Sequence, residues 1–423
     1  MTARSEMIAP DPIARDYLLL ALRLDRRIPG LVDGYFGPAD VRAQVEAEEP
    51  RTPARLREDA AELRARAAGQ VAEPDRRRWL AAQLVALETQ ARALDGDALP
   101  YLEHVNACFD FAPERTDEAV FTAAAADLAR LLPGDGSLAE RTAAWDARFT
   151  IPPDRLRAVI DALLPGFRER ARSLFGLPAG EHLTVSLVRD RPWSGYNWYD
   201  GGLRSRVEIN TDLPTRAADL LGVLPHETYP GHHLEHAWHE AHLVEEAGRL
   251  EASILCINAP ECLLSEGLAD LGRRFAVPAA DEVDLLVEIY RLAGLDVARD
   301  PVAARAAADA QIAITRAARA LGGVRGNAAL LRHADGATRE EVLAYLERYL
   351  LTTAERAAKR LEFIDHPLWR TYVFVYFEGE RLLSRWLERV PPTEQPARFR
   401  RLMTEQLTPG AIVDELAESA ATR

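Results

Sequence analysis

One property limits the folds open to this chain more than any other. Apolar residues recur at three- and four-residue spacing along most of its length, and the stretches that show this best are 12–28, 53–69, 75–95, 116–132 and 153–174. Such spacing places apolar side chains on one face of a helix. Segments with proline and glycine, such as LLPGDGS, separate the stretches, as helix ends require. The pattern predicts a mainly helical protein.

One region departs from this pattern. Residues 182–190 and 204–210 alternate apolar and polar side chains, and the aromatic stretch 194–202 between them is bounded by glycines. Alternation with period two is typical of half-buried strands. We therefore expect a mainly α protein with a small antiparallel β-sheet, in an α+β arrangement. The helix after the sheet has three candidate N-caps, Thr211, Asp212 and Thr215.

Composition excludes several classes of partner. The chain has 423 residues, of which 48% are hydrophobic and 28% charged, as in soluble globular proteins. Its net charge of -14 argues against nucleic acid, because phosphate-binding surfaces are basic. The apolar stretch near the start is interrupted by Arg23 and is too short to target or span a membrane. Three cysteines, Cys108, Cys256 and Cys262, are too few for a disulfide framework. We expect a cytoplasmic protein without nucleic-acid or membrane partners.

Four histidines gather in GVLPHETYPGHHLEH, residues 222–236. The pair His226-Glu227 matches the start of the zinc-peptidase motif HExxH. In that motif the two histidines lie one helical turn apart and converge on one ion, while the glutamate faces the metal-bound water. The second histidine would fall at position 230, which is Pro230. The motif is therefore either broken or differently spaced.

Proline explains a different spacing. Pro230 lacks an amide donor and clashes with the carbonyl group four residues earlier, so a regular helix cannot continue through it. A kink or bulge at Pro230-Gly231 would delay the next inward-facing position by one or two residues. Either His232 or His233 can then occupy the place of the second histidine. We favour His232, which needs the shorter bulge.

A third ligand is available further along the chain. Thermolysin-like and aminopeptidase-like zinc enzymes take a glutamate from a following helix, and LLSEGLADLGRR supplies Glu266 in an apolar helical run. A carboxylate among leucines is costly to bury without a cation beside it. The residues thus predict one zinc ion held by His226, His232 and Glu266, with Glu227 as the general base.

A rival metal site lies in the same stretch. The sequence HHLEH fits the inverted motif HxxEH, with His232 and His236 as ligands and Glu235 as the base. This interpretation gives no role to His226 and leaves Pro230 unexplained. We rank it second.

These motifs resemble those of a known bacterial family, domain of unknown function 885, which is regarded as a group of zincin-like candidate metallopeptidases. The family signature is similar to HE-x-x-PGHH followed by EGxA, and this chain has HETYPGHH from His226 and EGLA from Glu266. Weaker similarities lie at VDGYFGP (32–38), YFEGERLL (376–383) and LTPGAIVDEL (407–416). The chain departs from the family at Glu235, usually glutamine, and at Leu268, often tryptophan.

The resemblance implies a gluzincin-like catalytic unit embedded in a helical body, and Pro230-Gly231 as a family feature. It also makes Tyr376 the candidate donor to the oxyanion, because Tyr376 occupies the family's Y-x-x-G position. We expect a helical N-terminal half, 1–178, and a catalytic half, 179–423, in one integrated unit.

The expected function is a zinc-dependent hydrolase with one zinc ion per chain, most simply a metallopeptidase acting on a peptide or small amide. An extended peptide could pair with an edge offered by strand 204–210. Two alternatives stay open. One is a zinc enzyme acting on a non-peptide amide, ester or natural-product intermediate, and the other is a non-catalytic metal-binding protein. The intact His226-Glu227 pair favours an enzyme, because a structural zinc needs no base beside its ligand.

Overall fold

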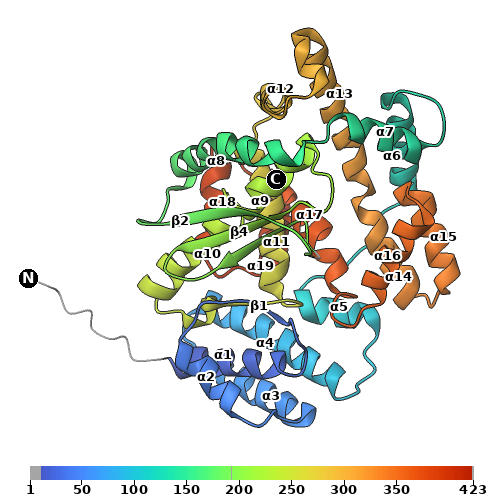
Figure 1. The fold of residues 1–423 in the computed structure, drawn as a ribbon. Coiled ribbons are helices and arrows are strands. Elements are labelled where there is room, and N and C mark those ends of the chain that lie inside the picture. Colours follow the sequence, from blue (N-terminus) through green and yellow to red (C-terminus); the bar gives the residue numbers. More distant parts are fainter. Residues whose placement is uncertain (1–10, 192, 422–423) are drawn as a thin grey trace, which may run out of the picture.

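The computed structural model describes residues 11–191 and 193–421. Figure 1 shows helices throughout, with a small sheet near the middle and the N-terminal helices packed at one end. That end comprises α1 (Pro12–Asp25), β1 (Val32–Tyr35), α2 (Ala39–Ala47), α3 (Pro53–Gln70) and α4 (Pro74–Leu94). The first helix begins where Asp11 accepts hydrogen bonds from the N–H groups of Ile13 and Ala14.

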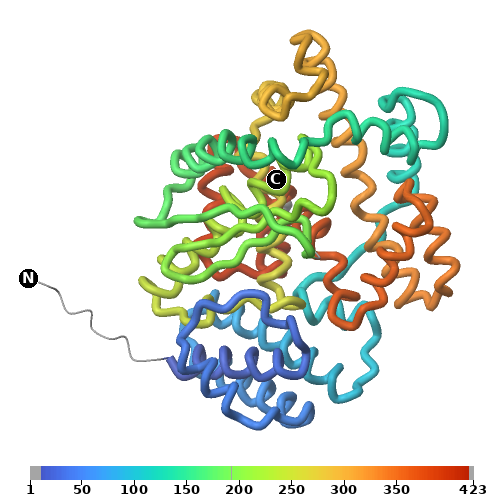
Figure 2. The backbone as a smooth tube through the Cα atoms, viewed as in Figure 1, coloured from blue at the N-terminus to red at the C-terminus, as the bar shows by residue number. Residues whose placement is uncertain are grey.

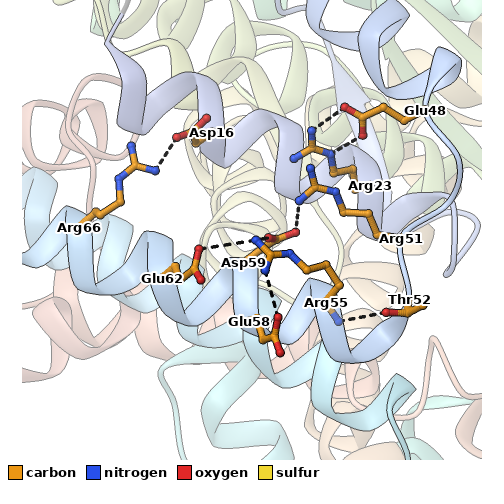
Figure 3. Close-up of polar contacts among 10 residues, drawn as sticks. All are labelled: Asp16, Arg23, Glu48, Arg51, Thr52, Arg55, Glu58, Asp59, Glu62 and Arg66. Atoms are coloured by element: carbon orange, nitrogen blue, oxygen red, sulfur yellow. Dashed lines mark hydrogen bonds and ion pairs between the residues drawn. The ribbon is translucent and has the colours of Figure 1, made fainter.

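Ion pairs cover the outer faces of these N-terminal helices (Figure 3). Arg23 Nη2 lies 2.6 Å from Glu48 Oε1, and Arg66 Nη1 lies 2.7 Å from Asp16 Oδ2. Exposed pairs contribute only about 0–1 kcal/mol each. The N-terminal end is therefore stabilised mainly by its buried cluster, which joins α1, α3 and α4 to the strand β5 (Ile254–Cys256).

The sheet follows the middle helices in the chain and contacts α9 (Ala217–Glu227) and α10 (His232–Trp238). Helices α5 (Tyr101–Phe109), α6 (Glu118–Leu131), α7 (Leu138–Arg148) and α8 (Pro153–Phe175) precede β2 (His182–Val188), β3 (Gly195–Tyr199) and β4 (Arg204–Asn210). The strand order is β2-β4-β3, with β3 antiparallel and β2 parallel to β4. The prediction of a mainly α protein with a small sheet is confirmed, but a purely antiparallel sheet is wrong.

The parallel pair has a local cause. Strand β4 has the most buried side chains of the three strands and lies in the centre of the sheet. The segment between β2 and β3 therefore passes over the end of β4, which leaves β2 parallel to β4. The Asn210 amide holds this crossing by donating to the carbonyl groups of Arg191 (2.8 Å) and Trp193 (2.9 Å). Because β4 is central, the expectation that strand 204–210 offers an edge to a peptide is wrong. The two edges belong to β2 and β3, whose outer sides pair with no strand among the described residues.

The histidine-rich region forms two helices and not one kinked helix. These are α9 (Ala217–Glu227) and α10 (His232–Trp238); the π-helix η1 (His239–Glu246), the 3-10 turn η2 (Leu250–Ser253), β5 and α11 (Pro260–Ala276) follow. None of the three predicted caps starts α9: its cap position is Arg216, without a side-chain bond. The N–H of Ala217 instead donates to the Phe149 carbonyl at 2.9 Å, so backbone replaces the cap.

The rest of the chain is helical: α12 (Glu282–Ala293), η3 (Asp296–Arg299), α13 (Pro301–Arg319), η4 (Ala320–Gly322), α14 (Gly323–His333), α15 (Arg339–Leu350), α16 (Ala354–Asp365), η5 (Tyr372–Phe374), α17 (Val375–Leu387), α18 (Gln395–Thr404) and α19 (Pro409–Ala421). In Figure 2 the yellow stretch of α11 and the red stretch of α17 run through the same central part of the molecule. They cross at Gly267 and Gly379, where a Cβ on Gly267 would lie 2.5 Å from the Gly379 carbonyl carbon.

A larger buried cluster extends from Tyr101 to Leu416 and includes α8, the sheet and α11. The division into 1–178 and 179–423 remains a proposal, because both halves contribute to this cluster. Across the described ranges, no helix combines the length and apolar character needed to cross a membrane.

Candidate metal centre

The turn between α9 and α10 brings two histidines together. The Gly231 N–H donates to the Pro225 carbonyl at 3.1 Å, which folds the chain back onto the end of α9. A Cβ at Gly231 would lie 1.9 Å from the His226 carbonyl oxygen, so only glycine fits this close approach. As a result, the rings of His226 and His232 lie 4.7 Å apart between centroids and perpendicular to each other.

Helix α11 completes the group with a carboxylate. Glu266 Oε2 lies 3.3 Å from His226 Nε2 and 3.7 Å from His232 Nε2. One ligand atom from each of these residues falls within 4.8 Å of the others. The structure thus brings together the three side chains that the sequence predicts as metal ligands. That they bind a metal stays a prediction.

The donor set fits a divalent cation. Glu266 Oε2 is buried and has no hydrogen-bond partner among the described residues, whereas Glu266 Oε1 accepts a hydrogen bond from the Tyr372 hydroxyl at 2.7 Å. A buried carboxylate oxygen without a hydrogen bond is costly, and a cation between it and the two imidazole nitrogens would remove that cost. Two imidazoles and one carboxylate are the donors of many catalytic zinc sites.

Electrostatics in the group favour positive charge. Burial acts to raise the pKa of Glu266, but the two neighbouring imidazoles outweigh it and hold that pKa well below its usual value. Burial acts to lower the pKa of His232, but Glu235 and Glu266 outweigh it and raise this pKa to about 10. Both shifts show that the negative charge of the group attracts positive charge, and a divalent cation bound between the three side chains would supply it.

Each of the two histidines is held through its other ring nitrogen. His226 Nδ1 lies 2.9 Å from Asp270 Oδ1. His232 Nδ1 lies 3.4 Å from Glu235 Oε2 and 3.3 Å from Ser265 Oγ, and Ser265 donates to Glu235 at 2.7 Å. A carboxylate behind an imidazole fixes the ring's tautomer and orientation in metal sites. Both Nε2 atoms therefore stay directed at Glu266.

His233 turns away from this group. Its Nδ1 lies 2.8 Å from Ser205 Oγ and its Nε2 lies 2.8 Å from Glu181 Oε2, and the side chains of His233 and Glu181 are fully buried. Tyr229 also donates to Glu181 at 2.5 Å. Both nitrogens of His233 are thus used in holding α10 against the sheet, which favours His232 as the ligand.

The rival group is also close in space. Ligand atoms of His232, Glu235 and His236 lie within 4.8 Å of one another. A cavity of about 470 Å³, lined by Glu235, His236 and Asp33 among others, adjoins this group. However, Glu235 Oε2 already accepts a hydrogen bond from Ser265, whereas Glu266 Oε2 accepts none from a described residue and faces only the two imidazoles. The first group is therefore the better metal site.

Glu227 lies beside the ligands without joining them. Its side chain is buried, with 7% of the residue exposed, and a Cβ on Gly195 would lie 3.0 Å from Glu227 Oε1. The Asn197 amide donates to the Glu227 carbonyl at 2.7 Å, which fixes the end of α9 against β3. Burial raises the pKa of Glu227, and the neighbouring charge of Glu266 adds to this against the effect of the histidines. A raised pKa makes a carboxylate a stronger base, which suits a group that accepts a proton from water.

Tyr376 is close to the group through a second tyrosine. Its hydroxyl lies 3.3 Å from that of Tyr372, which donates to Glu266. Sequence reasoning missed Tyr372, although its spacing of four residues from Tyr376 is a detectable signal of a shared helical face. It also missed Asp33, which accepts a hydrogen bond from Tyr196 at 2.7 Å and faces the same charges. No local sequence signal marks Asp33, because only the fold brings β1 to this place.

Comparisons with known proteins leave the family open. No protein-family model matches the chain, and no curated protein matches it. Among solved structures, it is similar to a protein from Colwellia psychrerythraea described as a candidate lipoprotein, with 15% identity and a TM-score of 0.49 over 87% of this chain and 67% of that one. It is also similar to a carboxypeptidase of Pyrococcus furiosus, with 13% identity and a TM-score of 0.41 over 97% and 95%. These scores are too low to assign an activity.

Proposed function

We propose that this protein is a zinc-dependent hydrolase, and specifically a metallopeptidase. The observation that carries the proposal is the convergence of His226, His232 and Glu266, whose buried Oε2 accepts no hydrogen bond from a described residue, with Glu227 buried next to them. The HE-PGHH and EGxA motifs, which resemble domain of unknown function 885, support the same conclusion. A structural metal site would have no need of Glu227.

In this proposal the chain's own groups divide the chemistry. A bound zinc ion supplies a Lewis acid that lowers the pKa of water and polarises the substrate carbonyl. Glu227 takes a proton from the attacking water as its oxygen bonds to the carbonyl carbon. Glu227 then delivers this proton to the leaving nitrogen as the C–N bond breaks. The Tyr376 hydroxyl donates a hydrogen bond to the carbonyl oxygen as that oxygen gains negative charge.

The free edge of β3 supports a peptide as the substrate. In the antiparallel register with β4, the N–H and C=O groups of Gly195, Asn197 and Tyr199 point away from β4. This edge lies next to Glu227, so an extended peptide pairing with it would pass the proposed base. Free, buried cysteines support a cytoplasmic location, and the net charge of -14 argues against nucleic acid.

The variant Glu227→Gln tests the proposal. It keeps the shape of the side chain and removes the basic oxygen, so zinc content should not change. Hydrolysis should fall by about 10²- to 10⁴-fold, the usual effect of losing a positioned proton-transfer group. The substrate is first found by screening peptides and small amides with the zinc-loaded wild type. Glu245→Gln, at an exposed position, is the matched control and should keep full activity.

Two results would overturn this proposal. Full activity of zinc-loaded Glu227→Gln would exclude Glu227 as the base. Loss of zinc from the same variant would make Glu227 a ligand and the assigned ligand set wrong. Hydrolysis of small amides or esters, with no peptide cleaved, would instead favour the non-peptide alternative.

A further inference from the structure

The cavity of about 470 Å³ that adjoins the candidate centre lies where the N-terminal helices meet the sheet. Strand β1 forms one part of its wall, and residues 197–200, from the end of β3, form another. Glu235 of α10, the carboxylate behind His232, lines the cavity as well. Figure 1 shows β1 at the end of the N-terminal helices that faces the sheet. A peptide that pairs with β3, as proposed above, would run beside this cavity.

Asp33 of β1 brings a carboxylate into this cavity. It is exposed, lines the cavity and accepts a hydrogen bond from the Tyr196 hydroxyl at 2.7 Å. Gly195, one residue before Tyr196, lies against the Glu227 side chain. Asn197, one residue after Tyr196, donates to the Glu227 carbonyl at 2.7 Å. These contacts place Asp33 opposite the part of β3 that adjoins the proposed base.

The cavity offers hydrogen-bond acceptors that lack donors. Asp33 forms no ion pair of 4.0 Å or less with a residue that the structure describes, and its carboxylate accepts one hydrogen bond, from Tyr196. Asn197 Oδ1 is buried and accepts no hydrogen bond from a described residue. The identity of this atom is fixed, because the amide nitrogen must face the Glu227 carbonyl in order to donate to it. Both residues line the same cavity, so a ligand there would be recognised by the N–H donors that it brings.

The arginines that line the cavity are engaged with other groups. Arg26 Nη1 donates to the Val45 carbonyl at 2.8 Å. The guanidinium carbon of Arg42 lies 4.6 Å from the centre of the Tyr35 ring. Neither arginine pairs with Asp33, which leaves the charge of this carboxylate for a cation that enters the cavity.

We propose that Asp33 binds a cationic nitrogen of the substrate in this cavity. An ammonium group carries three N–H donors, which suit the Asp33 carboxylate and the free oxygen of Asn197. Resting on the proposed hydrolase function, this identifies the substrate class: peptides that carry a positively charged nitrogen close to the bond that is cleaved. A free amino terminus and a basic side chain both provide this group.

A purely structural role for Asp33 makes a different prediction. In that role Asp33 would only fasten β1 to β3 through its hydrogen bond with Tyr196. Asp33→Asn keeps an acceptor oxygen for the Tyr196 hydroxyl and removes the charge, so it should change the choice between ligands only if Asp33 binds a cation. Tyr196→Phe breaks the fastening and keeps the charge, so it should retain most of a preference for cationic ligands.

The test measures binding, so that it does not depend on turnover. Zinc-loaded Glu227→Gln protein is titrated calorimetrically with an apolar tripeptide carboxamide that has a free amino terminus, with its N-acetyl form, and with an N-acetyl form whose first residue is lysine. The free amine should bind about 10- to 100-fold more tightly than its N-acetyl form, as expected for a hydrogen bond between charged groups. Adding Asp33→Asn should remove this preference. Asp40→Asn, at an exposed aspartate that does not line the cavity, is the control and should keep it.

The outcomes separate this inference from the proposed function. Tight binding of the lysine peptide, lost in Asp33→Asn, would support the inference and assign the cation to a side chain. Equal binding of all three peptides, binding of none, or a preference that survives Asp33→Asn would overturn it. A preference lost as fully in Tyr196→Phe as in Asp33→Asn would also overturn it and leave Asp33 a structural role. Peptide hydrolysis without a preference for cations would leave the proposed function standing, and a preference without hydrolysis of any peptide would leave only this inference.

Discussion

Replacing Gly267 by alanine should weaken both the fold and the metal centre. The added Cβ would lie 2.5 Å from the Gly379 carbonyl carbon, whereas carbon atoms normally approach to about 3.5–4.0 Å. The contacted atoms of Gly379 belong to a helix backbone and cannot rotate away, so α11 and α17 must separate by about 1 Å. Overpacking of this severity costs about 3 kcal/mol. In a chain of 423 residues that unfolds as one unit, this lowers Tm by roughly 3 °C.

The same separation moves Glu266, the neighbour of Gly267, away from Tyr372, so zinc affinity should fall by about tenfold or more. The assays are urea unfolding and competitive zinc titration. The control is Gly222→Ala in α9, where no atom lies within 4 Å of the added Cβ and alanine favours the helix. If Gly267→Ala unfolds and binds zinc like the wild type, the close crossing does not position the site and this reasoning fails.

The remaining predictions concern the buried neighbours of the centre. Burial acts to raise the pKa of Glu181, but hydrogen bonds from His233 and Tyr229 outweigh it and lower that pKa to about 2, below the ordinary value of 4.5. The ionised group therefore stabilises the fold above pH 4.5. As the pH falls from 4.5 to about 2, the free energy of unfolding of the wild type should drop by up to ~3 kcal/mol relative to that of Glu181→Gln, as measured by unfolding at each pH. A difference that does not change with pH would contradict this. His233→Ala should weaken zinc binding by no more than about 10- to 100-fold, and His232→Ala should weaken it far more. Equal losses of zinc affinity in the two variants would contradict the assignment of His232.

Much of the fold is readable from the sequence because it depends on local patterns. The helical stretches at 12–28, 53–69 and 153–174 correspond to α1, α3 and α8, since their apolar spacing and proline breaks act within a few residues. Strand direction is not local. The central place of β4 goes with the burial of its side chains in the larger cluster, which alternation alone does not encode.

The candidate site divides in the same way. His226, His232 and Glu266 are identifiable because their residue types and spacing carry the chemistry, even though the helix ends at Glu227 instead of kinking. The partners of the two His233 nitrogens, Ser205 and Glu181, lie far from His233 in the sequence, so only the folded chain reveals that His233 is not a ligand candidate.

The metal content of purified variants tests the central claim most directly. Protein purified without chelator is analysed by mass spectrometry for metal bound per chain, in the wild type and in His226→Ala, Glu266→Ala and His236→Ala. The wild type and His236→Ala should each carry about one zinc ion per chain, while His226→Ala and Glu266→Ala should carry none. A wild type without metal, or a His236→Ala variant that loses zinc while His226→Ala retains it, would contradict the proposed centre.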